Sequence, residues 1–189
     1  ILPHIGSSLP KTWKKVREAL ESDTRNYISL TEYLSICEQN GFKKREYKLQ
    51  LIGYLHDLGI CLHFQDDPLL NKTVILRPEW GTTAVYKALD NQTVRNNFGK
   101  FTKDDLTNIW NEEKYLDMSD ELLQLMIKFK LCYKIPGTSQ TYIAPQLLTE
   151  NQPEYDWDEN NNLILRYTYT FMPKGIITQF IVVMHEYIE

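Results

Sequence analysis

Apolar and polar positions in the first half of the chain change their spacing three times. Up to Leu58 the apolar residues recur at helical spacing, and Gly59 should end that helix because glycine readily takes a positive φ. Two short runs rich in β-forming residues follow at 60–64 and 73–76, with a polar, turn-forming stretch between them. Pro78 suits the first turn of a further helix, because its missing N–H would have no partner there. The apolar stripe predicted for the first of these helices consists of Tyr47, Leu51, Leu55 and Leu58.

The beginnings of two helices carry the same capping pattern. Ser29 with Glu32 predicts a capping box for a helix that reaches about Gln39, and Thr102 with Asp105 repeats the pattern. A later helix should be capped by Ser119. It should bury Leu122, Met126 and Phe129, and predicted strands at 131–135 and 141–144 follow it.

These elements form two units with one order: strand, helix, helix, strand, wing-like loop, strand. Ser29 corresponds to Thr102, Leu55 to Met126 and Thr73 to Thr141. We therefore predict an α+β fold, mainly helical, with two winged-helix-like units in tandem, at about 27–89 and 98–148. The alternative is two unrelated helix–hairpin segments.

The character of the chain changes after Pro153. An acidic, polar stretch leads to residues 163–171, which alternate strictly and predict a strand with Tyr167 and Phe171 on its large-residue face. A helix should begin at about Gly175. It is apolar nearly all round, so it should be covered on more than one side.

Composition narrows the class of protein. The 189 residues are 42% hydrophobic and 24% charged, which is ordinary for a soluble globular protein, and the net charge of −4 argues against a nucleic-acid binder. Three cysteines in apolar runs suggest reduced, buried thiols and a cytoplasmic protein. We see no signal peptide and no transmembrane span. The chain begins at Ile1 rather than Met, and we expect it to be a piece of a longer polypeptide.

Several motifs together resemble the COR (C-terminal of Roc) domain of Roco proteins. They are YLHDLGICLHF at 54–64, VILRPEW at 74–80 and Pro173-Lys174-Gly175, and the likeness covers nearly the whole chain. Roco proteins carry a Ras-like GTPase domain called Roc, and the family includes the leucine-rich-repeat kinases. The resemblance implies that residues 1–22 are a connecting helix from the Roc domain. Residues 23–152 would be the N-terminal COR subdomain, and 153–189 would be the start of a β-containing C-terminal one.

The resemblance implies a module with no chemistry of its own, which couples the adjacent Roc GTPase to dimerisation and signalling. The implied partners are the Roc domain of the same chain and a second copy bound through the complete COR domain. GTP or GDP with Mg²⁺ would bind only to Roc, because no GxxxxGK[ST] loop occurs here. We therefore predict no enzyme activity for this chain and no catalytic, cofactor or metal residues.

Interface candidates come from large side chains and the family motif. Aromatic residues dominate the energetics of packed interfaces, although the same residues also fill cores. The resemblance favours Tyr167 further, because the matching strand contributes to the contact between GTPase and COR. The candidates are Trp13, Trp80, Tyr167, Phe171 and Pro173.

Two alternative functions are open. The helix from Lys44 would be the recognition helix of a winged-helix nucleic-acid-binding domain, with basic residues Lys43, Lys44, Arg45 and Lys48, but the matching helix begins with acidic Asp120 and Glu121. Cys61 and His63, near His56, Asp66 and Asp67, suggest a metal or thiol enzyme. We favour a packed thiol, a half-exposed imidazole and a turn at Asp66-Asp67-Pro68, because no metal-ligand spacing occurs.

Overall fold

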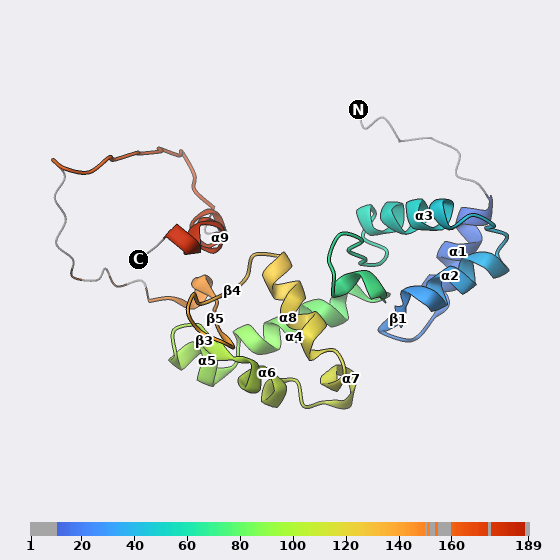
Figure 1. Ribbon diagram of the computed structural model, residues 1–189, viewed down its shortest axis with the longest axis horizontal. Helices are drawn as coiled ribbons and strands as arrows, with labels where there is room; N and C mark the ends of the chain where they lie inside the picture. The colour runs from blue at the N-terminus through green and yellow to red at the C-terminus, as the bar shows by residue number, and fades with distance from the viewer. Residues whose placement is uncertain (1–10, 150, 152–153, 155–159, 174, 188–189) are drawn as a thin grey trace. The chain divides into compact units, whose positions relative to one another are not determined.

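The structure is a computed structural model that describes residues 11–149, 151, 154, 160–173 and 175–187. The chain divides into two compact units, residues 1–84 and 85–189, and both combine helices with a small antiparallel sheet (Figure 1). Helix α4 (Pro78–Leu89) contains the boundary between them and begins at the predicted proline. The fold is thus mixed helix and sheet, as the pattern of the sequence predicts.

The first unit places three helices around a short sheet. These are α1 (Lys11–Ser22), α2 (Leu30–Gln39) and α3 (Arg45–Asp57). Strand β1 (Tyr27–Ser29) pairs antiparallel with β2 (Thr73–Ile75), which follows the short 3₁₀ helix η1 (Leu70–Lys72). Leu62 forms a single bridge with Ile75 on the other side of β2. The strand predicted at 60–64, before the wing-like loop, therefore contributes one bridge rather than a full strand.

Local hydrogen bonds explain where the helices of this unit begin and end. The Ser29 side chain accepts from the Glu32 N–H, and the Glu32 carboxylate accepts from the Ser29 N–H at 2.8 Å, so the predicted capping box is present. Gly59 has φ +70° just after α3, as expected of a residue that ends a helix. The core between these helices and strands is apolar; its members include Val16, Leu20, Ile28, Tyr33, Leu51, Leu55, Cys61 and Val74.

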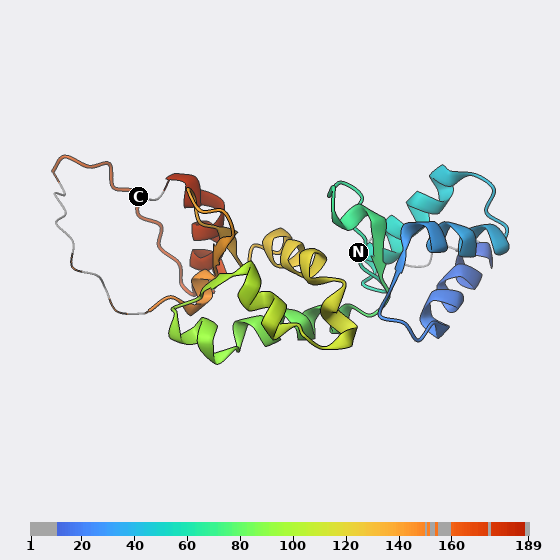
Figure 2. The same cartoon turned by 60° about the horizontal axis from the view of Figure 1, so that its bottom comes forward.

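The second unit combines short helices with a three-stranded sheet. Its helices are α5 (Gln92–Asn96), α6 (Lys103–Ile109), α7 (Glu113–Leu116), α8 (Ser119–Lys128) and α9 (Gly175–Met184), with 3₁₀ helices η2 (Pro145–Leu147) and η3 (His185–Tyr187). Strands β3 (Lys100–Thr102), β4 (Tyr133–Lys134) and β5 (Thr141–Ile143) form an antiparallel sheet with β5 in the middle. Figure 2 shows this sheet beside α5 and α9.

The two sheets share a pairing order. In the first unit β1, which precedes α2, pairs with β2, and Ser29 faces Thr73. In the second unit β3, which precedes α6, pairs with β5, and Thr102 faces Thr141. The other side of β2 bonds to Leu62, and the other side of β5 pairs with β4. Thr102 and Asp105 also form the second predicted capping box. Two of the predicted equivalences, Ser29 with Thr102 and Thr73 with Thr141, thus occupy matching positions in the strand pairing.

Several local predictions are wrong. Residues 163–171 form no strand, because a strand needs backbone partners and no described residue pairs with this segment. Ser119 does not cap α8: it is the first helical residue, and its hydroxyl donates to the Leu116 carbonyl at 3.5 Å. Phe129 ends α8 and is 43% exposed, since the chain turns away there.

The apolar stripe of α3 is narrower than predicted. Leu51 and Leu55 are buried, but Tyr47 and Leu58 lie at the ends of the helix and are exposed. Residues 1–10 of the predicted connecting helix at 1–22 lie outside the described residues, and α1 covers Lys11–Ser22.

Candidate interaction surfaces

Large apolar side chains are exposed along the segment before α9. Tyr167 is 73% and Phe171 81% exposed, and Pro173 is exposed beside them. Lys174 of the same motif lies outside the described residues. The other exposed large residues of the segment are Leu163, Ile164, Leu165, Tyr169 and Met172. Soluble proteins rarely leave so much contiguous apolar area in water, so this segment is a candidate interaction surface.

Helix α9 extends this apolar surface. It packs against η2, yet Val182 is the one buried residue among those described in this helix. Its exposed apolar side chains are Ile176, Ile177, Phe180 and Val183. The sequence predicts that this helix is covered on more than one side, whereas in the structure most of its described residues are exposed.

Trp13 lies between a core and a groove. Its ring packs on the core of the first unit and lies 5.3 Å from the Tyr54 ring, centroid to centroid, at an angle of 59°. The groove beside these rings, between α1 and α3, has a volume of about 430 Å³. Leu51, Leu55 and Leu58 form its apolar part, and Lys14, Arg17, Glu18 and Glu21 form its rim.

Trp80 is placed differently from the other candidates. Its side chain is only 6% exposed and lies 5.5 Å from the Tyr27 ring in the first unit. It therefore contributes to local packing and offers little surface to a partner.

The cluster around Cys61 has the environment of a core. Cys61 and Cys132 are free and buried, and burial raises the pKa of each thiol to about 12. Burial also raises the pKa of the Cys37 thiol. A thiol with such a pKa is protonated at neutral pH and is a poor nucleophile. Among the residues that the structure describes, no group of three His, Cys, Asp or Glu side chains could hold a metal ion.

His63 is buried rather than half-exposed. Only 4% of its surface is accessible, because the bridge between Leu62 and Ile75 draws this part of the chain into the unit. Its Nδ1 lies 3.0 Å from the Thr73 carbonyl oxygen, to which it donates. Burial lowers the pKa of the imidazole from its ordinary value near 6.5.

The turn predicted at Asp66-Asp67-Pro68 is confirmed. One Asp67 carboxylate oxygen accepts from the N–H groups of Leu69 and Leu70, each at 3.0 Å, and the Asp67 carbonyl accepts from the Asn71 N–H. This carboxylate thus holds the loop before η1 and is not half of a catalytic pair.

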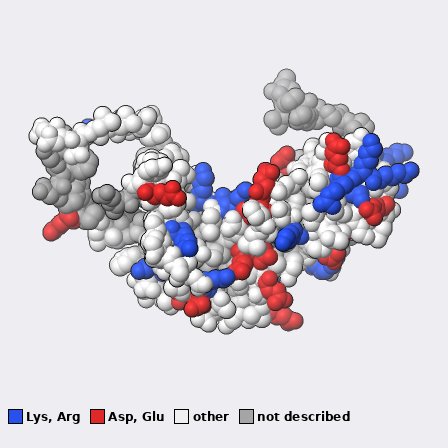
Figure 3. Space-filling view, viewed as in Figure 1, with Lys and Arg blue, Asp and Glu red and all other residues white. Residues whose placement is uncertain are grey.

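The recognition-helix hypothesis fails at Lys48. This residue is buried, and its ammonium pairs with Glu38, so it cannot reach a phosphate backbone. In the matching helix, Asp120 pairs with Lys103 at 2.6 Å. On the face shown in Figure 3, basic side chains gather near α1, whereas acidic and basic side chains are interspersed over the rest.

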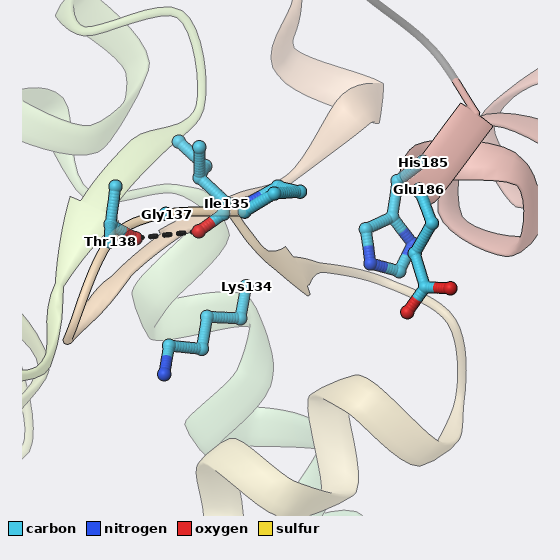
Figure 4. A pocket seen from close by; sticks show the side chains of 7 residues that line it. Lys134, Ile135, Gly137, Thr138, His185 and Glu186 are labelled. Carbon is cyan, nitrogen blue, oxygen red and sulfur yellow. Dashed lines mark hydrogen bonds between the residues drawn. The ribbon is translucent and has the colours of Figure 1, made fainter.

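A shallow pocket in the second unit was not anticipated from the sequence. It has a volume of about 470 Å³ and lies between the 135–138 turn and η3 (Figure 4). The His185 ring stacks on Tyr133 at 4.4 Å, and the Thr138 hydroxyl donates to the Ile135 carbonyl at 2.7 Å. Lys134 and Glu186, which also line it, carry opposite charges, so the pocket selects neither sign strongly.

Comparison with known families finds two domain families that match this chain. The family described as "C-terminal of Roc, COR-A domain" matches residues 10–148, and "C-terminal of Roc, COR-B domain" matches residues 160–189. This chain belongs to the COR domain family of Roco proteins. The family resemblance read from the 54–64, 74–80 and 173–175 motifs is thereby confirmed.

Similar proteins are longer than this COR chain. It is 30% identical over 180 residues to a Roc-COR-CHAT protease of Runella zeae, a match that covers 92% of this chain and 19% of that protein. It is 29% identical over 175 residues to the probable serine/threonine-protein kinase qkgA of Dictyostelium discoideum, covering 84% and 11%. The chain thus spans less than a fifth of the length of either curated relative.

A solved structure shares the fold of this COR chain. The structure of Methanosarcina barkeri Roco2 RocCORdC bound to GDP has a TM-score of 0.67 and 30% sequence identity, and the match covers 77% of this chain and 46% of that one. The names of this protein and of the Runella relative place a Roc domain together with COR. In the described part of the present chain, no helix has the length and apolarity needed to cross a membrane.

Proposed function

We propose that this COR chain couples an adjacent Roc GTPase domain to dimerisation and signal transmission in a cytoplasmic Roco protein. The exposed apolar side chains of 163–172 and α9 carry the proposal, because they are sufficient in number to bury against a second domain or a second copy. The proposal also rests on the Roc domains that accompany COR in the named relatives.

In this proposal the chain contributes contacts and no chemistry. GTP, GDP and Mg²⁺ bind to the Roc domain, since the sequence has no phosphate-binding GxxxxGK[ST] loop. The protonated, buried thiols of Cys61 and Cys132 are consistent with this division of labour. The protease or kinase named for the relatives would then belong to parts of those proteins outside the COR domain.

We also propose that both units are winged-helix-like in architecture and that their shared form serves protein contacts. The common pairing order of the two sheets and the two capping boxes support this reading. The buried, paired Lys48 favours protein contacts over nucleic acid.

The coupling proposal is tested with a polypeptide that carries this COR region complete, together with the Roc domain of the same protein. Analytical ultracentrifugation in GDP and in a non-hydrolysable GTP analogue should give different proportions of dimer. Identical sedimentation in every nucleotide state would contradict coupling.

A matched pair of tyrosine substitutions tests the surface. Tyr167→Ala should weaken the contact between the Roc and COR parts by about 1–3 kcal/mol, as truncation of an interface aromatic does. Tyr86→Ala, at a tyrosine that is also exposed, should have no effect on the contact. Binding is measured by titrating the separate Roc domain into the COR chain. A large loss of melting temperature in isolated Tyr167→Ala would assign this residue to a core instead.

A further inference from the structure

A polar pocket in the first unit has a one-sided charge. It has a volume of about 490 Å³ and lies where the first turn of α2, the start of α3, η1 and the 60–64 segment meet. Arg45 and Lys72 line it, and no carboxylate does. The groove beside Trp13 and the pocket in Figure 4 each contain acidic residues.

Both cations are available to a ligand. In the described part of the chain neither Arg45 nor Lys72 pairs with a carboxylate. Arg45 is also the first residue of α3, where a cation opposes the positive end of the helix dipole. Its position is therefore not explained by the stability of α3. Glu32, at the same end of α2, is engaged by Ser29 and Arg25 and does not line the pocket.

The first turn of α2 adds hydrogen-bond donors. Leu30 and Thr31 line the pocket and are the first two residues of this ten-residue helix. Their N–H groups have no partner within the helix, since the first four N–H groups of any helix lack one, and the capping side chain of Ser29 serves Glu32. Such N–H groups and the dipole favour an anion.

His63 supplies the observation that points to a ligand. It is buried and lines the pocket, and its Nδ1 is engaged by the Thr73 carbonyl, which leaves Nε2 without a protein partner. No side-chain nitrogen or oxygen in the described residues is both fully buried and unbonded. Nε2 is therefore partly accessible to solvent, and His63 lines this pocket.

We propose that this pocket binds an oxyanion of the phosphate class, as free phosphate or as a phosphorylated side chain. Arg45, Lys72 and the α2 N–H groups donate to its oxygens, and Asn71, which also lines the pocket, offers a further amide. Neutral His63 presents a lone pair at Nε2, which accepts from a protonated ligand oxygen such as the hydroxyl of HPO₄²⁻. A fully ionised phosphomonoester has no such proton, so its binding takes one up from solvent and strengthens as the pH falls towards 6. The groups that face His63 are the cations Arg45 and Lys72, which line the same pocket, and the His56 ring, whose Nδ1 accepts from the backbone N–H of His63. This inference is independent of the coupling function.

The test is an NMR titration of the histidine C–H signals of the 189-residue chain. Inorganic phosphate should raise the pKa of His63 in a saturable manner, whereas sodium chloride at matched ionic strength should not. Arg45→Gln/Lys72→Gln should weaken the phosphate response at least about tenfold. Lys11→Gln/Lys15→Gln removes the same charge from exposed positions of α1 outside the pocket and should leave the response unchanged.

Titration with N-acetylphosphoserine amide separates the two sources of the ligand. Tighter binding than inorganic phosphate assigns a phosphorylated side chain, and weaker binding assigns free phosphate. Single Lys72→Gln serves as a second variant if the double variant does not fold. Equal responses to phosphate and chloride, or a phosphate response that survives the substitutions in a folded variant, would overturn the proposal.

Discussion

The hydroxyl of Tyr33 donates a 2.8 Å hydrogen bond to the backbone carbonyl of Lys48, and this bond joins α2 to α3 inside the first unit. Both residues are buried, and burial raises the pKa of the Tyr33 hydroxyl, so it stays protonated and remains a donor. The Lys48 side chain is buried in the same core, and its ammonium forms an ion pair with Glu38. These contacts set the separation of the two helices that support the anion pocket.

Removal of the Tyr33 hydroxyl measures how much its hydrogen bond to the Lys48 carbonyl contributes to stability. Tyr33→Phe should lower the free energy of unfolding by about 1 kcal/mol, the usual net value of one buried hydrogen bond. Tyr86→Phe removes the same atom from an exposed ring and should change stability by less than about 0.5 kcal/mol. Urea unfolding of both variants checks the difference, and equal effects would show that the buried bond contributes nothing.

The Lys48–Glu38 pair should respond unequally to loss of either partner. The Lys48 side chain is 4% exposed, whereas that of Glu38 is 66% exposed. Glu38→Gln leaves a buried ammonium without its counter-charge and should cost about 1–3 kcal/mol. Lys48→Met leaves a carboxylate that water can solvate, and it should cost less than about 1 kcal/mol. Urea unfolding decides: a larger loss in Lys48→Met would contradict this account.

His63 should make the first unit sensitive to mild acid. Because burial lowers the pKa of His63 in the folded state, the unfolded chain binds a proton first as the pH falls below about 6.5. Stability contributed by neutral His63 is present above that pH and is lost below it, by at most about 1.4 kcal/mol per pH unit.

Urea unfolding at pH 7.5 and 5.5, in chloride buffers without phosphate, measures this dependence. His63→Gln should reduce the difference in stability between the two pH values, whatever it costs at pH 7.5. The low pKa of Glu32, about 2, arises mainly from the Ser29 N–H and the Arg25 guanidinium and affects only more acidic solutions. An unchanged difference in His63→Gln would show that another group titrates.

Gly99 should be irreplaceable in the second unit. It has φ +83°, and a Cβ there would collide with the backbone oxygen of Ala144, whose N–H donates to the Gly99 carbonyl at 2.9 Å. Gly137 has a similar φ of +74° but open space around it. Gly137→Ala should therefore cost about 1–2 kcal/mol, from the left-handed conformation alone.

Gly99→Ala should cost about 1–3 kcal/mol more than Gly137→Ala, because the collision adds to the backbone strain. The melting temperatures of the two variants provide the comparison. Equal losses would mean that the backbone near Ala144 moves aside without cost.

Features within a few residues of each other could be predicted well. The capping boxes at Ser29 and Thr102 formed as expected, because donor and acceptor lie three residues apart and need no other part of the chain. The end of α3 at Gly59 likewise depends on local backbone freedom. The family motifs could also be recognised directly, since each is a continuous stretch of sequence.

The interface candidates show that sequence patterns do not predict which large side chains are covered in the fold. Trp13 and Trp80 look alike as large residues on helical patterns, but Trp80 packs beside Tyr27, far away in sequence, and is covered. The anion pocket could not be foreseen either, because its residues come from four separate elements. In the sequence, the basic residues around Arg45 indicate only a candidate nucleic-acid contact.

The sequence by itself determined the capping boxes at Ser29 and Thr102, the end of α3 at Gly59 and membership of the COR family, because these depend on neighbouring residues and recognisable motifs. Only the tertiary structure decided that Lys48 and His63 are buried and that 163–171 has no strand partner among the described residues. Burial and strand pairing require atoms from distant segments. Alternation of residues within one segment cannot supply them.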